Sequence, residues 1–287
     1  MGFFDHIAAC NRHDVTRFIS FDVAGHAVGR VNREFADQLK AWPEIFQITD
    51  TAVQFLESSP AADDRTERLA WVLNELVDQD FLLPFHGERY AVRGEDMAEP
   101  LLLIDRAMAP CFGIRAFGQH VNAIVRGSDG LKMWIGRRAA DRRHYPGCLD
   151  NLAAGGLPYG ISLQNNLAKE CWEEAGIPVE LAGQAIPVGA VSYHMDTRMG
   201  FKSDTLFCYD LELPEDFRPE CTDGEVQEFY LWPVEEVMER VKGGDEFKLN
   251  CNLVIIDFLI RYGFITPDEP DYMNLLTGLH PVLPPLE

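Results

Sequence analysis

Hydrophobic and polar residues follow two different periods along this chain, and each period predicts its own kind of element. Short β-like runs cover residues 18–23 and 27–31, and a helical spacing continues to a stop near Pro43. The stretch 66–80 repeats apolar residues every three or four positions, which predicts an amphipathic helix. Its expected apolar stripe comprises Leu69, Val72, Leu73, Leu76 and Val77. The first third of the chain therefore mixes helices and strands.

From Phe112 onward the pattern changes to strands that are joined by turns. A β-rich run reaches residue 125, the sequence SDG at 128–130 marks a hairpin turn, and a second strand follows it. Further strands are predicted around 184–195, 203–213 and 225–234, and helices over 234–242 and 251–263. We therefore expect an α/β protein in which strands flank one loop-and-helix unit.

The change of pattern near residue 110 indicates two units and a tail. We assign 1–110 to an N-terminal α+β accessory domain, 111–270 to the main α/β domain and 271–287 to a proline-rich C-terminal tail. The run 81–93 predicts a strand, a turn and a strand, and we expect Trp71 and Phe81 in a core rather than on a ligand. The first unit has no acid cluster or phosphate-type glycine loop. We therefore expect it to form one wall of a pocket or to support a homodimer.

One stretch, 155–177, has the residues that point to chemistry. A glycine pair and a proline make a loop, Ser162 can cap the start of a helix, and Gly176 can end that helix about three turns later. At about 100° per residue, three acids fall within roughly a third of the helix circumference. These acids are Glu170, Glu173 and Glu174, and the residues on the opposite, packed side are Ala168, Cys171, Trp172 and Ala175.

Three carboxylates this close repel one another, and the i, i+4 pair destabilises the helix. A solvated helix face is the ordinary explanation of such a cluster by itself. The glycines before and after the acids favour a second explanation, a divalent cation that removes the repulsion. Hard cations such as Mg²⁺ or Mn²⁺ take oxygen ligands and commonly share them with a substrate phosphate.

Composition and charge narrow the classes of partner. With 287 residues and 47% hydrophobic residues, the chain can bury a sizeable core. No apolar run reaches the roughly 18 residues of a membrane helix, and we see no secretion signal. Seven cysteines without CxxC spacing fit a reducing compartment, which we expect to be the cytoplasm. The net charge of −21 argues against nonspecific binding to nucleic acid, but it does not exclude a small anionic substrate.

The stretch 155–177 resembles a Nudix box, the glycine loop and helix of enzymes that hydrolyse a nucleoside diphosphate linked to another group. The family pattern is G-x5-E-x7-R-E-U-x-E-E-x-G-U, where U is aliphatic. Gly155 fills the first glycine, and the second half fits the pattern through Ile177. Two positions depart: Ile161 replaces a glutamate, and Lys169 replaces an arginine, losing its planar bidentate fork. The resemblance implies a Nudix α/β/α sandwich.

Other motifs are similar to one Nudix subgroup, whose N-terminal domain is shared with a fungal fusion to thiamine pyrophosphokinase. They are FGI with GQHVN, RR with YPGCLDN, CYDLELPEDFRPE, DGEVQEF and CNLVIIDFLIRYGFI, and the resemblance covers most of residues 15–270. It implies metal-dependent hydrolysis of thiamine diphosphate, or of its oxidised or analogue forms, to the monophosphate. Two alternatives stay open: hydrolysis of another nucleotide-type diphosphate, and a Nudix binding module that has lost turnover.

The resemblance also implies roles for the acids. The implied metal ligands are Glu170, Glu174 and Glu173, completed by the backbone carbonyl of Ala154. The same three glutamates are candidate catalytic residues, and Glu225 is a candidate general base on a later loop. The alternative role of Glu225 is a solvated strand end.

Seven further residues are candidates for binding the small-molecule diphosphate, and each also has a structural explanation. They are His120, Asn122, Arg138, Arg143, Asp150, Asn151 and Tyr193. The arginines offer donors that match phosphate oxygens, or they solubilise a strand edge. The Asp-Asn pair structures the turn before the box or contacts substrate. The histidine and its neighbouring asparagine alternate on one strand and can share a pocket, and the tyrosine stacks on an aromatic ring or packs in the core.

Overall fold

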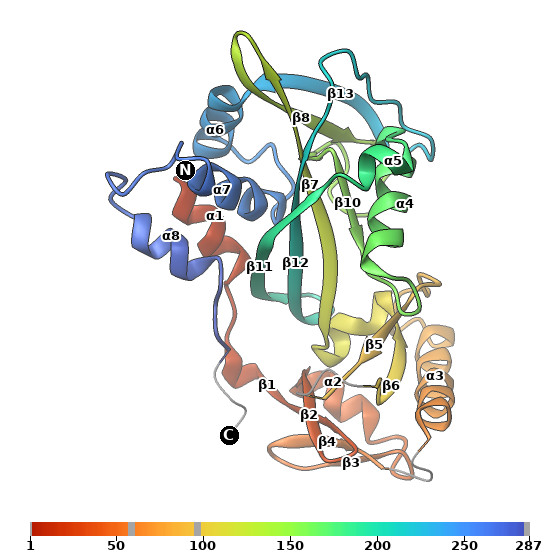
Figure 1. The fold of residues 1–287 in the computed structure, drawn as a ribbon. Coiled ribbons are helices and arrows are strands. Elements are labelled where there is room, and N and C mark those ends of the chain that lie inside the picture. The colour runs from red at the N-terminus through yellow and green to blue at the C-terminus, as the bar shows by residue number, and fades with distance from the viewer. Residues whose placement is uncertain (1, 57–60, 95–98, 284–287) are drawn as a thin grey trace.

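A computed structural model describes residues 2–56, 61–94 and 99–283, and it builds two main sheets from different parts of the chain (Figure 1). The N-terminal sheet has the strand order β2-β1-β4-β3, in which β1 and β4 are parallel. Its strands are β1 (Phe18–Val23), β2 (His26–Asn32), β3 (Phe46–Ile48) and β4 (Ala52–Phe55). A two-stranded ribbon, β5 (Arg89–Val92) and β6 (Leu102–Asp105), and helices α2 (Arg33–Leu39) and α3 (Ala62–Asp78) share a core with this sheet.

The larger sheet has the strand order β11-β12-β7-β8-β13, with β10 paired to β7 and β9 paired to β8. Its strands are β7 (Arg115–Gly127), β8 (Gly130–Arg138), β9 (Leu149–Asn151), β10 (Ala153–Gly156), β11 (Ile186–Thr197), β12 (Gly200–Glu212) and β13 (Val226–Pro233). The predicted hairpin turn at 128–130 is confirmed, because it joins β7 to β8. Strand β10 pairs with the long strand β7, so Gly155 and Gly156 are part of the larger sheet.

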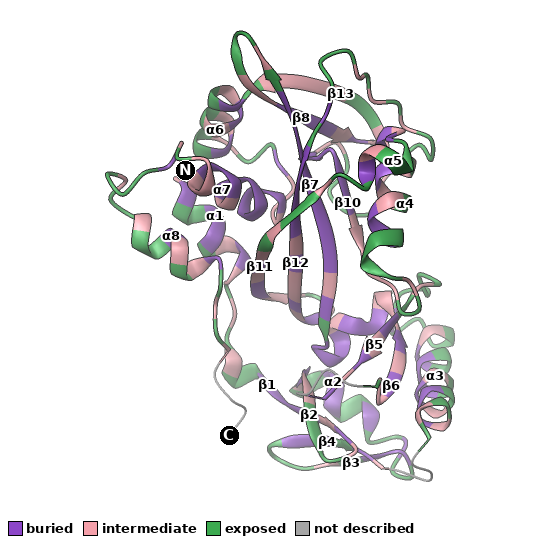
Figure 2. Cartoon of the chain, in the orientation of Figure 1, coloured by how far each residue is buried: buried purple, intermediate pink, exposed green. Residues whose placement is uncertain are grey.

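Helices cover both faces of the larger sheet (Figure 1). On one face lie α4 (Leu163–Ala175) and α5 (Val179–Ala182), and on the other lie α6 (Val234–Gly243) and α7 (Cys251–Arg261). A separate apolar core fills each interface, and the buried segments in Figure 2 follow the sheet and the inner faces of these helices. The predicted α/β/α sandwich with an additional N-terminal α+β part is confirmed.

Helices from the first and last parts of the chain pack together beside this sandwich. Helix α1 (Phe3–Cys10) packs against α7 and against α8 (Tyr272–Gly278), and its apolar residues join the core that α7 fills. Residues that precede the N-terminal sheet therefore pack with the larger one. The predicted tail includes α8, whose Leu275 is buried, and its positions 284–287 lie outside the described residues. Across the described ranges, no helix is long and apolar enough to cross a membrane.

Helix α3 confirms the predicted apolar stripe, but two aromatic residues near it are not in the core. Trp71 is 50% exposed, because it lies about 200° around the helix from the buried Leu69. Phe81 is 48% exposed and stacks on Phe35 with ring centroids 6.2 Å apart. The expectation that both residues pack in a core was wrong. The first strand predicted in 81–93 is also absent, since β5 pairs with β6 instead.

A 3₁₀ helix, Arg106–Phe112, joins the two sheets through very close backbone contacts. A Cβ added to Gly29 on β2 would lie 2.1 Å from the carbonyl oxygen of Phe112. Gly113, which ends the 3₁₀ helix, has a φ of +59°, and a Cβ there would lie 2.4 Å from the Arg30 carbonyl oxygen. The junction therefore depends on glycines that let backbone approach backbone.

We expect Gly29→Ala to lower the free energy of unfolding by about 2 kcal/mol, because the new methyl group must push a carbonyl away. The matched control is Gly243→Ala at the end of α6, where nothing lies within 4 Å of the added Cβ. Urea unfolding of both variants checks the prediction. Equal stability of Gly29→Ala and wild type would mean that the junction is looser than described.

Candidate active site

Helix α4 begins and ends where the sequence predicts. The Ser162 hydroxyl accepts a hydrogen bond from the Asn165 backbone N–H at 3.2 Å, and Gly176 ends the helix in the left-handed conformation with a φ of +63°. The predicted packed face needs correction, because Trp172 is 54% exposed whereas Glu174 is only 5% exposed. Helix α4 is therefore rotated so that one of its acids, together with Cys171, points toward the sheet.

The buried carboxylate of Glu174 lies against β10. Its Oε2 accepts a hydrogen bond from the Ala154 backbone N–H at 2.7 Å. Burial raises the pKa of Glu174 well above its ordinary value, and the negative charges of Asp150 and Glu170 raise it further. The hydrogen bond from Ala154 only partly offsets this. A cation beside these carboxylates would favour the ionised form.

Glu170 packs against the first glycine of the box. A Cβ added to Gly155 would lie 2.1 Å from the Glu170 carboxylate carbon, so a side chain at this position would displace the carboxylate. Lys169 lies between two of the acids, with its Nζ 3.2 Å from Glu170 Oε1 and 3.1 Å from Glu173 Oε2. Burial raises the pKa of Glu170, and Lys169 opposes that rise.

These residues fit a hard divalent cation. The donors nearest β10 are carboxylate oxygens, Glu174 is buried and Glu170 is partly buried, and desolvation raises the pKa of both. Among the residues that the structure describes, no group of three or more His, Cys, Asp or Glu side chains already converges on one point. Lys169 pairs with both Glu170 and Glu173 on this helix. A cation at this site would therefore compete with the Lys169 ammonium for Glu170 and Glu173.

Asp150 lies on β9 beside this site and is paired twice. Its Oδ2 is 2.8 Å from Lys248 Nζ and 3.2 Å from Arg138 Nη1. Burial alone would raise the pKa of Asp150, but Lys248, His120 and Arg138 outweigh it and hold the pKa below its ordinary value. Asp150 is therefore ionised, and the positive charges of Lys248 and Arg138 balance its negative charge. Sequence patterns did not indicate Lys248, because it lies 98 residues away in a loop.

Three of the predicted substrate residues form one buried hydrogen-bond chain instead of an open surface. His120 Nδ1 lies 2.9 Å from Asn151 Oδ1, and Asn151 Nδ2 donates to Asn122 Oδ1 at 3.0 Å. Asn122 Nδ2 then donates to Asp210 Oδ1 at 3.0 Å, and Arg261 pairs with Asp210. Since His120 pairs with Ala154 in the sheet register, the chain supports the strand that Glu174 contacts.

The remaining predicted residues lie around the site at different depths. Arg143 is exposed in the loop between β8 and β9. Glu225 Oε1 lies 2.8 Å from Arg142 Nη2, and its loop is tied to α4, because the Thr222 N–H donates to the Glu173 carbonyl oxygen at 2.8 Å. Tyr193 is buried, and its hydroxyl donates to Asp204 Oδ2 at 2.7 Å. The structure thus brings Glu225 toward the end of α4 and gives Tyr193 an internal partner.

The N-terminal part also reaches the site, through two residues that the sequence did not indicate. A Cβ added to Gly156 would lie 2.3 Å from the Tyr90 hydroxyl and 3.0 Å from the Arg106 guanidinium carbon. Burial raises the pKa of Tyr90, Arg106 opposes that rise, and the negative charge of Glu170 adds a smaller contribution to it. Tyr90 is on β5 and Arg106 begins the 3₁₀ helix, so only tertiary contacts bring them to the box.

Comparisons with known proteins agree with this two-part organisation. The profile described as NUDIX domain matches residues 116–250, and one described as a domain of unknown function, DUF4743, matches residues 2–116. Nudix hydrolase 20, chloroplastic, from Arabidopsis thaliana is 43% identical over 290 residues, covering 97% of this chain and 77% of that protein. Nudix hydrolase 24, chloroplastic, from the same plant is 42% identical over 285 residues, with the same coverage of both chains.

Among solved structures, the NUDIX domain of Shewanella oneidensis NrtR complexed with ADP ribose aligns with a TM-score of 0.42 and 13% identity, over 53% of this chain and 90% of that chain.

The plant relatives match the chain almost from end to end, so they define a hydrolase with a Nudix domain behind an N-terminal domain. This chain belongs to the Nudix hydrolase family. Enzymes of this family generally use divalent metal ions, which the oxygen donors beside β10 fit.

The buried histidine gives a pH dependence with a definite sign. Burial first, and Lys248 next, lower the pKa of His120 from 6.5 to about 4. Between these values the unfolded chain takes up a proton that the folded protein does not, so stability is lost as the pH falls. Between pH 7 and pH 5, the free energy of unfolding of wild type should fall by about 2 kcal/mol because of His120. We expect this part of the fall to be absent in His120→Gln.

Urea unfolding of wild type and His120→Gln at both pH values measures this difference. His26→Gln serves as the control, because His26 is exposed on β2. A pH slope that is the same in wild type and His120→Gln would contradict the burial of a neutral histidine beside β10.

The packing of Glu170 on Gly155 gives a second prediction. We expect Gly155→Ala to fold, because the overlapping atoms end a flexible side chain, but to displace the Glu170 carboxylate from β10. Hydrolysis should fall by about tenfold or more, while the unfolding free energy changes by less than about 1 kcal/mol. Steady-state kinetics and urea unfolding, with Gly243→Ala as control, test this. Unchanged hydrolysis by Gly155→Ala would show that Glu170 does not work from this position.

Proposed function

We propose that this Nudix hydrolase cleaves thiamine diphosphate, or its oxidised or analogue forms, to the monophosphate and inorganic phosphate. The observation that carries the hydrolytic site is the pair of carboxylates, the partly buried Glu170 and the buried Glu174, held against the glycine-rich strand β10. The choice of substrate rests on the motifs similar to the thiamine-related subgroup. It is compatible with relatives that match both parts of the chain.

The residues around β10 suit the needs of this reaction. Glu170, Glu174, Glu173 and the Ala154 carbonyl would hold Mg²⁺ or Mn²⁺, which when bound supplies charge neutralisation for the diphosphate. Hydrolysis adds one water to a phosphorus atom and breaks the bond from that phosphorus to the oxygen between the two phosphates. Glu225 would take the proton of the water, because its loop is tied to the end of α4.

The other charged residues would position the substrate and its site. Asp150 stays ionised between Lys248 and Arg138 and so fixes β9 beside β10. Arg143 extends from the adjoining loop and would bind phosphate oxygens. His120, Asn122 and Asn151 would act by holding β10 in place from inside the sheet rather than by contact with the substrate.

A degenerate binding module is the second candidate, and Lys169 is the observation that favours it. Its ammonium already neutralises Glu170 and Glu173, so a bound cation must compete with an internal one. Phosphate release from thiamine diphosphate and from a panel of other diphosphates, over a range of Mg²⁺ and Mn²⁺ concentrations, separates the candidates. Hydrolysis of another diphosphate but not of thiamine diphosphate would refute the proposed substrate. If the protein hydrolyses no compound of the panel at any metal concentration, it is a binding module and not a hydrolase.

We expect Glu174→Gln to lower the rate of diphosphate hydrolysis about a thousandfold, or about 4 kcal/mol, because it removes a buried charge with little change in shape. The amide oxygen can still accept the Ala154 hydrogen bond, so the variant should fold. Glu180→Gln on the exposed surface of α5 is the matched control. A wild-type rate for folded Glu174→Gln would refute the assignment of this site.

A further inference from the structure

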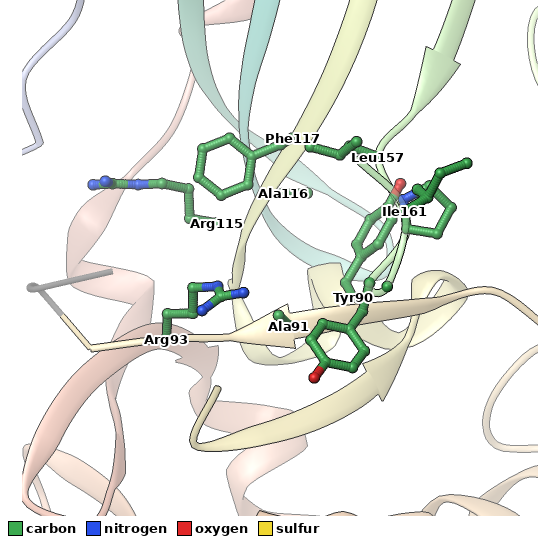
Figure 3. Close-up of a pocket in the computed structure, with 11 residues that line it drawn as sticks. Tyr90, Ala91, Arg93, Arg115, Ala116, Phe117, Leu157 and Ile161 are labelled. Atoms are coloured by element: carbon green, nitrogen blue, oxygen red, sulfur yellow. The ribbon is translucent and has the colours of Figure 1, made fainter. Parts of the chain in front are cut away.

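A small pocket lies where the N-terminal part meets the loop of the Nudix box (Figure 3). Its volume is about 170 Å³. Its apolar and aromatic walls include Tyr90, Ala91, Phe117, Leu157, Pro158 and Ile161. Figure 3 shows Arg93 and Arg115 toward one side of this space, with Tyr90, Leu157 and Ile161 toward the other. Neither part of the chain forms this pocket without the other.

The size and surface of the pocket suit one aromatic ring. A cavity of about 150 Å³ lined by apolar side chains can hold a benzene molecule, and the walls here offer comparable space. Phe117 is already half-buried and stacks on Phe207, with ring centroids 5.7 Å apart. The apolar position Ile161 contributes to the wall at the place where the family pattern has a glutamate. The departure from the box thus has a structural role, because a carboxylate would make this wall charged.

Tyr90 connects the pocket to the acids. Its side chain lines the pocket, yet its hydroxyl touches Gly156, the residue after the glycine on which Glu170 packs. The Tyr90 side chain as a whole is only 7% exposed. A tyrosine hydroxyl at the junction of pocket and box is placed to donate a hydrogen bond to a substrate oxygen.

We infer that this pocket binds an aromatic ring of the substrate's organic group, and that the Tyr90 hydroxyl donates to an oxygen near the bond that joins the ring-bearing group to the diphosphate. This inference rests on the proposed function, because it assumes that the diphosphate of the substrate lies at the carboxylates of α4. It does not depend on which organic group the substrate has. The N-terminal part is then a specificity element of the hydrolase. Arg115, exposed at the rim and without an ion-pair partner in the described ranges, would meet an anionic or neutral substituent.

Phenyl phosphate and methyl phosphate separate binding of the ring from binding of the phosphate. We expect wild type to bind phenyl phosphate about tenfold more tightly than methyl phosphate in calorimetric titrations. Ala91→Phe and Ile161→Phe fill the pocket from opposite walls and should abolish this preference. Ala27→Phe adds the same side chain at an exposed position on β2 and should retain it. Circular dichroism identifies a variant that fails to fold. If one of the two filled variants does not fold, the binding preference of the other filled variant tests the inference.

The inference is overturned if wild type shows no preference for phenyl phosphate, or if a folded, filled variant keeps the preference. Kinetics with thiamine diphosphate separate this outcome from failure of the proposed function. A filled variant should raise KM about tenfold with little change in kcat, and an unchanged KM contradicts the pocket. Wild type that prefers phenyl phosphate but does not hydrolyse thiamine diphosphate would refute the proposed substrate and leave the pocket assigned.

Discussion

The hydrogen bond from the Ala154 backbone to the Glu174 carboxylate is the contact on which the site depends. It fixes the rotation of α4, because a carboxylate can be buried only where donors or cations satisfy it. That rotation places the Glu170 carboxylate against Gly155, where an added side chain would displace it. It also turns Trp172 outward. One polar contact between a helix and a strand thus decides which acids meet the glycine-rich strand.

A layer of buried polar groups supports this contact from beneath. His120, Asn151 and Asn122 pass hydrogen bonds across three strands to Asp210, and Asp150 balances its charge on Lys248 and Arg138. Each member has a partner, so the network positions β9 and β10 without leaving an uncompensated charge. The N-terminal part adds a further constraint through the close contact of Tyr90 with Gly156. The site is therefore shared between both parts of the chain.

The sequence was sufficient where the signal is local. Ser162 and Gly176 marked the ends of α4, and the apolar period of α3 marked its buried stripe, because caps and periodicity act within a few residues. The sequence was insufficient where distant segments meet. Nothing near Lys248 or Tyr90 indicates a partner about 70 to 100 residues away in the chain. Helical spacing alone predicted that Trp172 is packed and that Glu174 is exposed. The prediction failed because spacing does not show that the Ala154 backbone N–H can satisfy a buried Glu174 carboxylate.

Binding of Mn²⁺, measured by electron paramagnetic resonance, tests most directly whether the carboxylates on α4 form a metal site against β10. We expect saturable binding to wild type and to Glu180→Gln, and a loss of affinity of about tenfold or more in Glu170→Gln and Glu174→Gln. Because this readout does not depend on substrate, it is independent of the organic group. Equal Mn²⁺ affinity in wild type and in both α4 variants would show that these carboxylates do not bind the metal.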